Sequence, residues 1–221
     1  MSAGPISHDA RQTARLTRVW PLVFLIALCT AIELVLLASD LGIAPDRLRR
    51  MATDWAGFWP GLLGSWQPNY PGQSWAMFAS YAFLHAGPIH LAINMLTLWS
   101  LGRIVIDRVG ALGFWALYAG AVLGGAATFG LIGDTLRPMV GASGALFGLV
   151  GGLLAWNYVD RYTFSEGLWP VARAALLLIA MNLVLWWAMD GQLAWETHLG
   201  GFVTGWVLAL LIDPRGRAAP E

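Results

Sequence analysis

The stretch VGASGALFGLVGG, residues 140–152, places one serine, Ser143, inside a run of glycine and alanine. Gly144, Gly148 and Gly152 recur every four residues, so on a helix they form one ridge of small residues. Such ridges let two helix backbones approach closely inside a membrane. Ser143 is therefore either a small residue that eases helix packing or a nucleophile held within a membrane.

The composition around this stretch is that of an integral membrane protein. Of 221 residues, 57% are hydrophobic and 12% are charged, and the mean hydropathy is +0.61, whereas soluble domains carry roughly 25% charged residues. Thirteen arginines, with no lysine, balance thirteen acidic residues. The chain thus has no net field to attract nucleic acid, and its expected partners lie in the lipid bilayer. The single cysteine, Cys29, cannot form an internal disulfide.

Six apolar segments have about the 20 residues that a hydrocarbon core near 30 Å thick requires. They predict an all-α membrane protein, a bundle of six transmembrane helices over 19–213, with short tails at 1–18 and 214–221. The N-terminal tail is too polar for a signal peptide, which predicts that the first helix is retained. The segments are 19–41, 86–106, 111–133, 141–158, 170–190 and 196–213.

The arginines predict how this bundle is oriented, because arginine favours the cytoplasmic side. With a cytoplasmic N-terminus, nine arginines lie inside, and only Arg47, Arg49, Arg50 and Arg137 lie outside. We therefore expect both termini in the cytoplasm. The richness in Arg, Ala, Gly and Trp suggests a bacterial inner membrane, although the arginine-bearing tail leaves an organellar membrane open.

The long connection over about 42–85 is unusual for a loop. Its central part, 51–75, carries four tryptophans and a phenylalanine among glycine and proline: Trp55, Phe58, Trp59, Trp66 and Trp75. The segment is too short and too broken to span a membrane, yet aromatic enough to lie at the interface. We expect an interfacial loop that flanks the bundle.

Polar residues gather where the second, fourth and sixth predicted helices begin, which is the outer face in this orientation. They are His85, His90, Asn94, Ser143 and His198; of the four histidines only His8 lies elsewhere. Because polar groups inside a span are costly, their common depth predicts a functional site.

The spacing of these residues suggests acyl-transfer chemistry. Gly201 and Gly205 form a second small ridge just after His198, and its packing against Gly144 and Gly148 would bring His198 near Ser143. Histidine is suited to act as the base that activates a serine nucleophile.

An oxyanion produced by this attack needs hydrogen-bond donors. His90 and Asn94 share one helix face, and they join the backbone N–H of Ser143 as the expected donors. Glu196 is two residues from His198 and faces elsewhere, so a Ser–His dyad is expected rather than a triad.

Each of these residues also has a simpler interpretation. His90 with Asn94 is compatible with an interhelical clamp, His198 with a contact near the headgroups, and His85 with a structural or water-holding role. No metal site or cofactor is expected, and a metalloprotease site is disfavoured because a His-Glu-x-x-His motif is absent. An intramembrane aspartyl site needs two carboxylates in neighbouring spans, and Asp134 has no facing partner. Glu33, a lone acid inside the first helix, either marks an ion path or bonds a neighbouring helix or water.

Three motifs in order, FASYAFLHAGPIHLAINM (78–95), GASGALFG (141–148) and HLGGFVTG (198–205), resemble those of the rhomboid intramembrane serine proteases. The resemblance implies a six-helix bundle, a catalytic Ser143 and His198, oxyanion contacts from His90 and Asn94, and a cavity lined by His85. It also implies that Phe147 packs on the His198 ring.

The substrates that the resemblance implies are transmembrane helices of other proteins, cut near the outer face. A lateral gate is implied at the 170–190 helix and the 190–196 loop. Two alternatives remain: a non-catalytic rhomboid-like protein that binds transmembrane clients, and a small transporter that uses Glu33 and the histidines.

Overall fold

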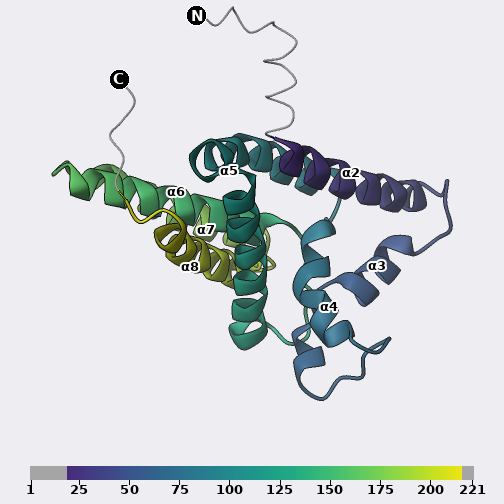
Figure 1. Ribbon diagram of the computed structural model, residues 1–221. Coiled ribbons are helices and arrows are strands. Elements are labelled where there is room, and N and C mark those ends of the chain that lie inside the picture. Colours follow the sequence, from purple (N-terminus) through teal and green to yellow (C-terminus); the bar gives the residue numbers. More distant parts are fainter. Residues whose placement is uncertain (1–18, 216–221) are drawn as a thin grey trace, which may run out of the picture.

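The computed structural model describes residues 19–215, and this part of the chain is helical, with no strand (Figure 1). The tail at 1–18 with His8, and residues 216–221 of the other tail, lie outside the described residues. The helices are α2 (Trp20–Asp40), α3 (Leu48–Ala56), η1 (Pro60–Leu63), α4 (Gln73–Ser80), η2 (Tyr81–Phe83), α5 (Pro88–Ile132), α6 (Ser143–Thr163), α7 (Trp169–Ala188) and α8 (Trp195–Ile212).

Helix α5 consists of two helices that meet at a kink. Its 45 residues would extend about 68 Å if straight, roughly twice the thickness of a hydrocarbon core. Gly110 breaks it with a φ of 74°, a left-handed conformation that glycine adopts without steric cost. This break falls between the predicted segments 86–106 and 111–133.

Four of the described helices are long and apolar enough to cross a membrane: α2, α5, α7 and α8. The prediction of an all-helical membrane protein is therefore confirmed for the described residues. Helix α6 is 21 residues long but carries Asp160 and Arg161 near its end, and it is not among the four. The number of six crossings stays a prediction.

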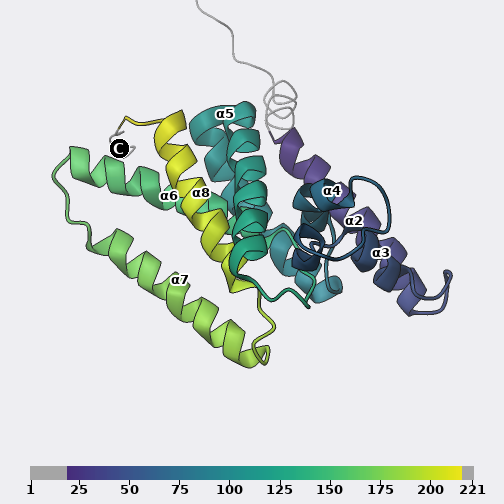
Figure 2. The same ribbon diagram turned by 90° about the horizontal axis from the view of Figure 1, so that it is seen from below.

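The core lies where α5, α6 and α8 pack together. A methyl group on Gly201 of α8 would collide with the carbonyl oxygen of Gly144 in α6, and one on Gly205 with that of Gly148. The two helix backbones are thus in direct contact along the small-residue ridges, and Figure 2 shows them side by side. The buried Trp156 of α6 also donates a hydrogen bond to the Ala209 carbonyl of α8 at 2.9 Å.

An ionic cluster fixes one end of this core. Arg108, just before the kink in α5, donates to Asp160 near the end of α6 at 2.7 Å and to Asp213 after α8 at 3.1 Å. Its guanidinium also lies over the Trp156 ring, 4.9 Å from the centroid. The ends of α6 and α8 therefore meet here, and their first turns meet at the opposite end of the core.

The predicted loop at 42–85 contains two short α-helices, α3 and α4, which lie on the flank of α2 and α5 (Figure 1). Phe58 is buried and exchanges two backbone hydrogen bonds with Met139, each of 2.9 Å. The buried Gln73 side chain donates to the Asp54 carbonyl at 2.7 Å. Trp75, in contrast, is 80% exposed. Phe58 therefore joins the segment to the residues after α5, and Gln73 links two parts of the segment itself.

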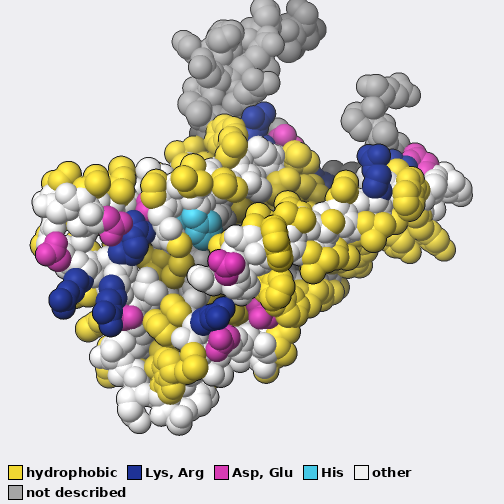
Figure 3. Space-filling view, turned by 180° about the vertical axis from the view of Figure 1, so that it is seen from behind, with side chains coloured by type: hydrophobic (Ala, Val, Ile, Leu, Met, Phe, Trp, Pro, Cys, Tyr) yellow, Lys and Arg dark blue, Asp and Glu magenta, His cyan; other side chains and the backbone are white. Residues whose placement is uncertain are grey.

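Helix α7 stands away from the core along most of its length (Figure 2). Val171 is its one buried residue, whereas large apolar side chains such as Leu177, Leu183 and Trp187 are exposed. Figure 3 shows hydrophobic side chains along this flank and charged ones gathered on the opposite side, over α3 and its neighbours. An exposed apolar flank of this kind suits contact with lipid.

Candidate active site

Ser143 is the first residue of α6, and the preceding turn determines its position. Gly141 has a φ of 126°, which favours glycine, and its N–H donates to the Tyr81 carbonyl at 3.0 Å. The first N–H groups of a helix have no partner inside it and carry a partial positive charge. The half-buried Ser143 side chain therefore lies beside free backbone donors.

His198 lies in the first turn of α8, and the glycine ridges bring it to Ser143. Its Nε2 is 2.8 Å from the Ser143 Oγ, and the residue is only 6% exposed. Phe147, one turn after Ser143, stacks on the imidazole with ring centroids 4.2 Å apart and planes 8° from parallel. The serine and the imidazole thus meet at hydrogen-bonding distance, with the ring held flat against Phe147.

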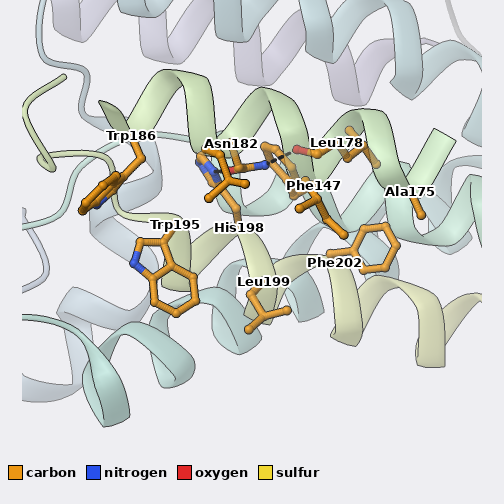
Figure 4. Close-up of a pocket in the computed structure, with 11 residues that line it drawn as sticks. Phe147, Ala175, Leu178, Asn182, Trp186, Trp195, His198, Leu199 and Phe202 are labelled. Atoms are coloured by element: carbon orange, nitrogen blue, oxygen red, sulfur yellow. Dashed lines mark hydrogen bonds between the residues drawn. The ribbon is translucent and has the colours of Figure 1, made fainter. Parts of the chain in front are cut away.

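The other nitrogen of His198 meets Asn182 of α7, a contact that the sequence analysis missed. The Asn182 Oδ1 lies 2.7 Å from Nδ1, and Figure 4 shows the carboxamide beside the imidazole. The available signal was a lone carboxamide in the apolar run between Arg173 and Asp190. The expected pair of Ser143 and His198 therefore has a third hydrogen-bonded residue, Asn182, whose side chain is a carboxamide and not a carboxylate.

The structure places His90 close to the serine turn. A methyl group on Gly141 would lie 2.8 Å from the Cε1 of His90, so the imidazole lies against the turn that leads to Ser143. Its Nδ1 accepts a hydrogen bond from the Ala86 N–H at 3.2 Å, which leaves Nε2 as its proton-bearing nitrogen when the ring is neutral.

Asn94 uses one of its two amide N–H groups within its own helix. The residue is buried, and its Nδ2 donates to the His90 carbonyl one turn earlier in α5, at 2.8 Å. The second N–H of the amide is not used in this bond, so an oxyanion contact from Asn94 does not require the bond to break. Sequence spacing put His90 and Asn94 on one face, but it did not reveal this local hydrogen bond.

His85 lies next to His90, in the residues just before α5. It is buried, and its ring meets the His90 ring edge to face, with centroids 5.2 Å apart. Burial, and secondarily the nearby His90, lowers the pKa of His85 to about 4. The imidazole is therefore neutral near pH 7, so its ring nitrogens add hydrogen-bonding groups to the site without adding a charge.

Glu33 of α2 is an ion-pair partner of the loop segment. Its side chain is 3% exposed, and Arg49 of α3 donates to both of its oxygens, at 2.8 and 3.1 Å. The Glu33 carboxylate raises the pKa of Arg49 further above its usual range. Arg49 also donates to the His85 carbonyl at 2.8 Å. Of the two interpretations of Glu33, the structure favours a bond to a neighbouring helix.

A cavity of about 530 Å³ opens beside the imidazole, between α6, α7 and α8. Apolar side chains line most of it, including Leu178, Trp186, Trp195 and Phe202 (Figure 4). His198 and Asn182 supply its polar groups. A serine–imidazole pair beside an apolar space is an arrangement in which nucleophilic attack on an apolar polypeptide segment is chemically feasible.

Comparison with known proteins agrees with this arrangement. Residues 71–215 match the Rhomboid domain. RHOMBOID-like protein 5 of Arabidopsis thaliana is 33% identical over 147 residues, which cover 65% of this chain and 46% of that protein. Rhomboid protease GluP of Bacillus subtilis is 32% identical over 139 residues, covering 62% of this chain and 26% of that protein.

A third relative, the mitochondrial Rhomboid protein 1 of Saccharomyces cerevisiae, is 32% identical over 141 residues, covering 56% of this chain and 38% of that protein. The chain thus spans less than half the length of these relatives. The domain match itself covers well over half of the chain and includes Ser143, His198, His90 and Asn94. The chain therefore belongs to the rhomboid family.

Proposed function

We propose that this protein is an intramembrane serine endopeptidase that cuts transmembrane segments of other membrane proteins near the outer face. The observation that carries the proposal is the 2.8 Å separation of the Ser143 Oγ and the His198 Nε2. A nucleophile within hydrogen-bonding reach of a base is the arrangement that covalent acyl transfer requires. The Bacillus relative, which is named a protease, supports the same activity.

The proposed reaction follows from the two side chains. His198 takes the Oγ proton as Ser143 attacks the carbonyl carbon of the scissile peptide bond. The imidazolium then gives that proton to the departing amine nitrogen as the C–N bond breaks, which leaves an ester on Ser143. Water, deprotonated by the same imidazole, hydrolyses the ester, and the proton returns to the serine oxygen.

The oxyanion of each tetrahedral intermediate is proposed to lie among three donors. The backbone N–H of Ser143 is free at the helix start, and His90 lies against the adjacent turn. Asn94 would join them through the second N–H of its amide, whose first N–H bonds the His90 carbonyl. Removing one such donor costs about 3 kcal/mol of transition-state stabilisation in comparable sites.

The proposed membrane arrangement has six crossings, with both halves of α5 and with α6 spanning, and with both termini in the cytoplasm. Its support is that Arg108 joins α5, α6 and α8 at one end of the core, whereas Ser143 and His198 meet at the other. The count of nine arginines on the proposed inner side against four on the outer side supports an outer position for the Ser143 end. We further propose, from composition alone, that the membrane is a bacterial inner membrane.

A serine-reactive fluorophosphonate probe tests the activity in the detergent-purified full chain. Labelling of the wild type that disappears in Ser143→Ala and in His198→Ala is the expected result. A model transmembrane substrate should be cut by the wild type and remain intact with Ser143→Ala. Absence of labelling in a folded wild-type protein, or cleavage that persists in Ser143→Ala, would overturn the proposal.

The same experiment separates the two alternatives. A non-catalytic rhomboid-like protein would bind a transmembrane client without labelling or cleavage. A transporter that works through Glu33 is disfavoured, because both oxygens of that carboxylate are held by Arg49. A transporter of this kind would have to show a transmembrane solute flux that the Glu33→Gln substitution abolishes.

A further inference from the structure

Asn182 is a polar residue in the apolar part of α7 that follows Arg173, and the proposed Ser–His chemistry does not by itself require it. It lies in the second half of α7, and both ends of its carboxamide are hydrogen bonded: Oδ1 to His198 and Nδ2 to the Leu178 carbonyl. The inference below rests on the proposed function and concerns what this residue does for the base.

The Leu178 carbonyl determines which way the carboxamide points. A carbonyl oxygen only accepts hydrogen bonds, so the Asn182 atom 2.9 Å from it must be the N–H₂ group. The opposite end of the carboxamide, 2.7 Å from the His198 Nδ1, is then the oxygen. The hydrogen-bond partners therefore determine which end of the carboxamide is the oxygen, which the nearly symmetric shape of the group does not do.

This orientation in turn determines the tautomer of His198. Because the Asn182 oxygen can only accept, Nδ1 must carry the proton. In the neutral imidazole the lone pair then lies on Nε2, which is 2.8 Å from the Ser143 Oγ. The serine hydroxyl must therefore be the donor in that contact, which is the protonation state from which a base can accept the serine proton.

We propose that Asn182 is a positioning residue that fixes the tautomer and ring plane of His198, so that the competence of the base depends on where α7 lies. Four groups form one chain: the Leu178 carbonyl, the Asn182 amide, the His198 imidazole and the Ser143 hydroxyl. Phe147 packs on the face of the His198 ring, and Asn182 determines how the ring is rotated and which of its nitrogens carries the proton.

The position of α7 matters because this helix is weakly held. Val171 is its one buried residue, and the 530 Å³ cavity separates much of α7 from α6 and α8. The hydrogen bond between Asn182 and His198 links α7 to α8 beside that cavity (Figure 4). A displacement of α7 by more than a fraction of an ångström would break this hydrogen bond and allow the imidazole to change tautomer.

The test compares Asn182→Leu, Asn182→Asp and the control Leu183→Ala in the full chain. Leucine removes the acceptor at nearly constant volume, and aspartate keeps an acceptor toward Nδ1. Leu183 lines the same cavity from α7 and has an apolar side chain. We measure the fluorophosphonate labelling rate of Ser143, the kcat and KM for a transmembrane substrate, and the melting temperature.

The expected result is a labelling rate and a kcat roughly 5- to 100-fold lower in Asn182→Leu, the range for loss of a buried hydrogen bond. KM and melting temperature should stay near those of Leu183→Ala. Asn182→Asp should restore labelling, and its pH profile should shift upward because a carboxylate favours the imidazolium. His90 of α5 also acts on His198 electrostatically, and it is unchanged in all variants.

A spectroscopic readout tests the tautomer directly. In ¹⁵N-histidine spectra of the wild type, His198, assigned with His198→Gln, should show a protonated Nδ1 and an unprotonated Nε2, and Asn182→Leu should show a mixture. Wild-type labelling and spectra in Asn182→Leu would overturn the inference and leave the proposed function standing. Failure of the wild type itself to label would instead overturn the proposed function.

Discussion

Gly201 of α8 lies so close to the backbone of Gly144 in α6 that a side chain as small as a methyl group would collide with the Gly144 carbonyl oxygen. Gly205 stands in the same relation to Gly148. These two contacts bring the first turns of α6 and α8 together, and with them Ser143 and His198. The small-residue ridge is thus the structural condition for the contact between the two side chains.

Gly201→Ala should therefore separate the two helices, destabilise the protein and reduce labelling of Ser143. Forcing an extra methyl group into close packing costs about 1 to 3 kcal/mol. The melting temperature in detergent and the fluorophosphonate labelling rate measure the two effects. Gly167→Ala is a matched control, because a methyl group at Gly167 would meet no atom within 4 Å. Equal stability and labelling in both variants would contradict this account of the helix contact.

Arg49→Ala should destabilise the protein strongly, because it leaves the Glu33 carboxylate buried without its partner. Breaking a buried ion pair from one side costs about 3 to 5 kcal/mol, whereas the double variant Glu33→Gln with Arg49→Ala should recover part of this loss. Thermal unfolding in detergent measures both effects.

Arg50→Ala is the control for Arg49. The Arg50 side chain is 81% exposed, and its nearest carboxylate, Asp54, is 3.8 Å away. An exposed pair of this kind contributes about 0 to 1 kcal/mol. If Arg49→Ala were no more harmful than Arg50→Ala, the Glu33 contact would not hold the loop segment to α2.

Acid should destabilise the protein in part through His85. Its pKa is lowered to about 4 in the folded protein, against roughly 6.5 when unfolded. The folded state thus binds fewer protons between these values, so stability falls as the pH drops from about 6.5 to 4. His85→Gln cannot titrate, and its melting temperature should fall less over this range. Identical pH slopes for the variant and the wild type would refute this contribution.

Part of the site follows from local sequence alone. The four-residue spacing of His90 and Asn94 put them on one helical face, and both lie in the first turns of α5. The break between the second and third predicted helices was evident from the change in hydropathy, and Gly110 provides it. The segment at 42–85 was expected as an interfacial loop, and its helices α3 and α4 were not foreseen. At nine and eight residues they are shorter than the roughly 11 to 18 residues over which helical periodicity is read.

Other features depended on contacts between distant residues. Asn182 lies 16 positions from His198 along the chain, and only the angle at which α7 meets α8 brings their side chains together. Glu33 and Arg49 are likewise 16 residues apart and on different helices. The side chain of Asn94 bonds within its own helix because the carbonyl of His90, one turn earlier, lies within reach, a local competition that residue spacing does not resolve.

Composition and helical period, which are properties of each segment alone, predict the helical membrane class, the small-residue ridges and the gathering of histidine, asparagine and serine at three helix starts. The glycine ridges also led us to expect His198 near Ser143, and in the packed helices their side chains are 2.8 Å apart. The contact of Asn182 with His198 and the pairing of Glu33 with Arg49, in contrast, follow only from how separate helices pack. Hydrogen bonds and ion pairs form over about 3 Å, and the pattern of a single segment does not specify which distant groups come within that distance.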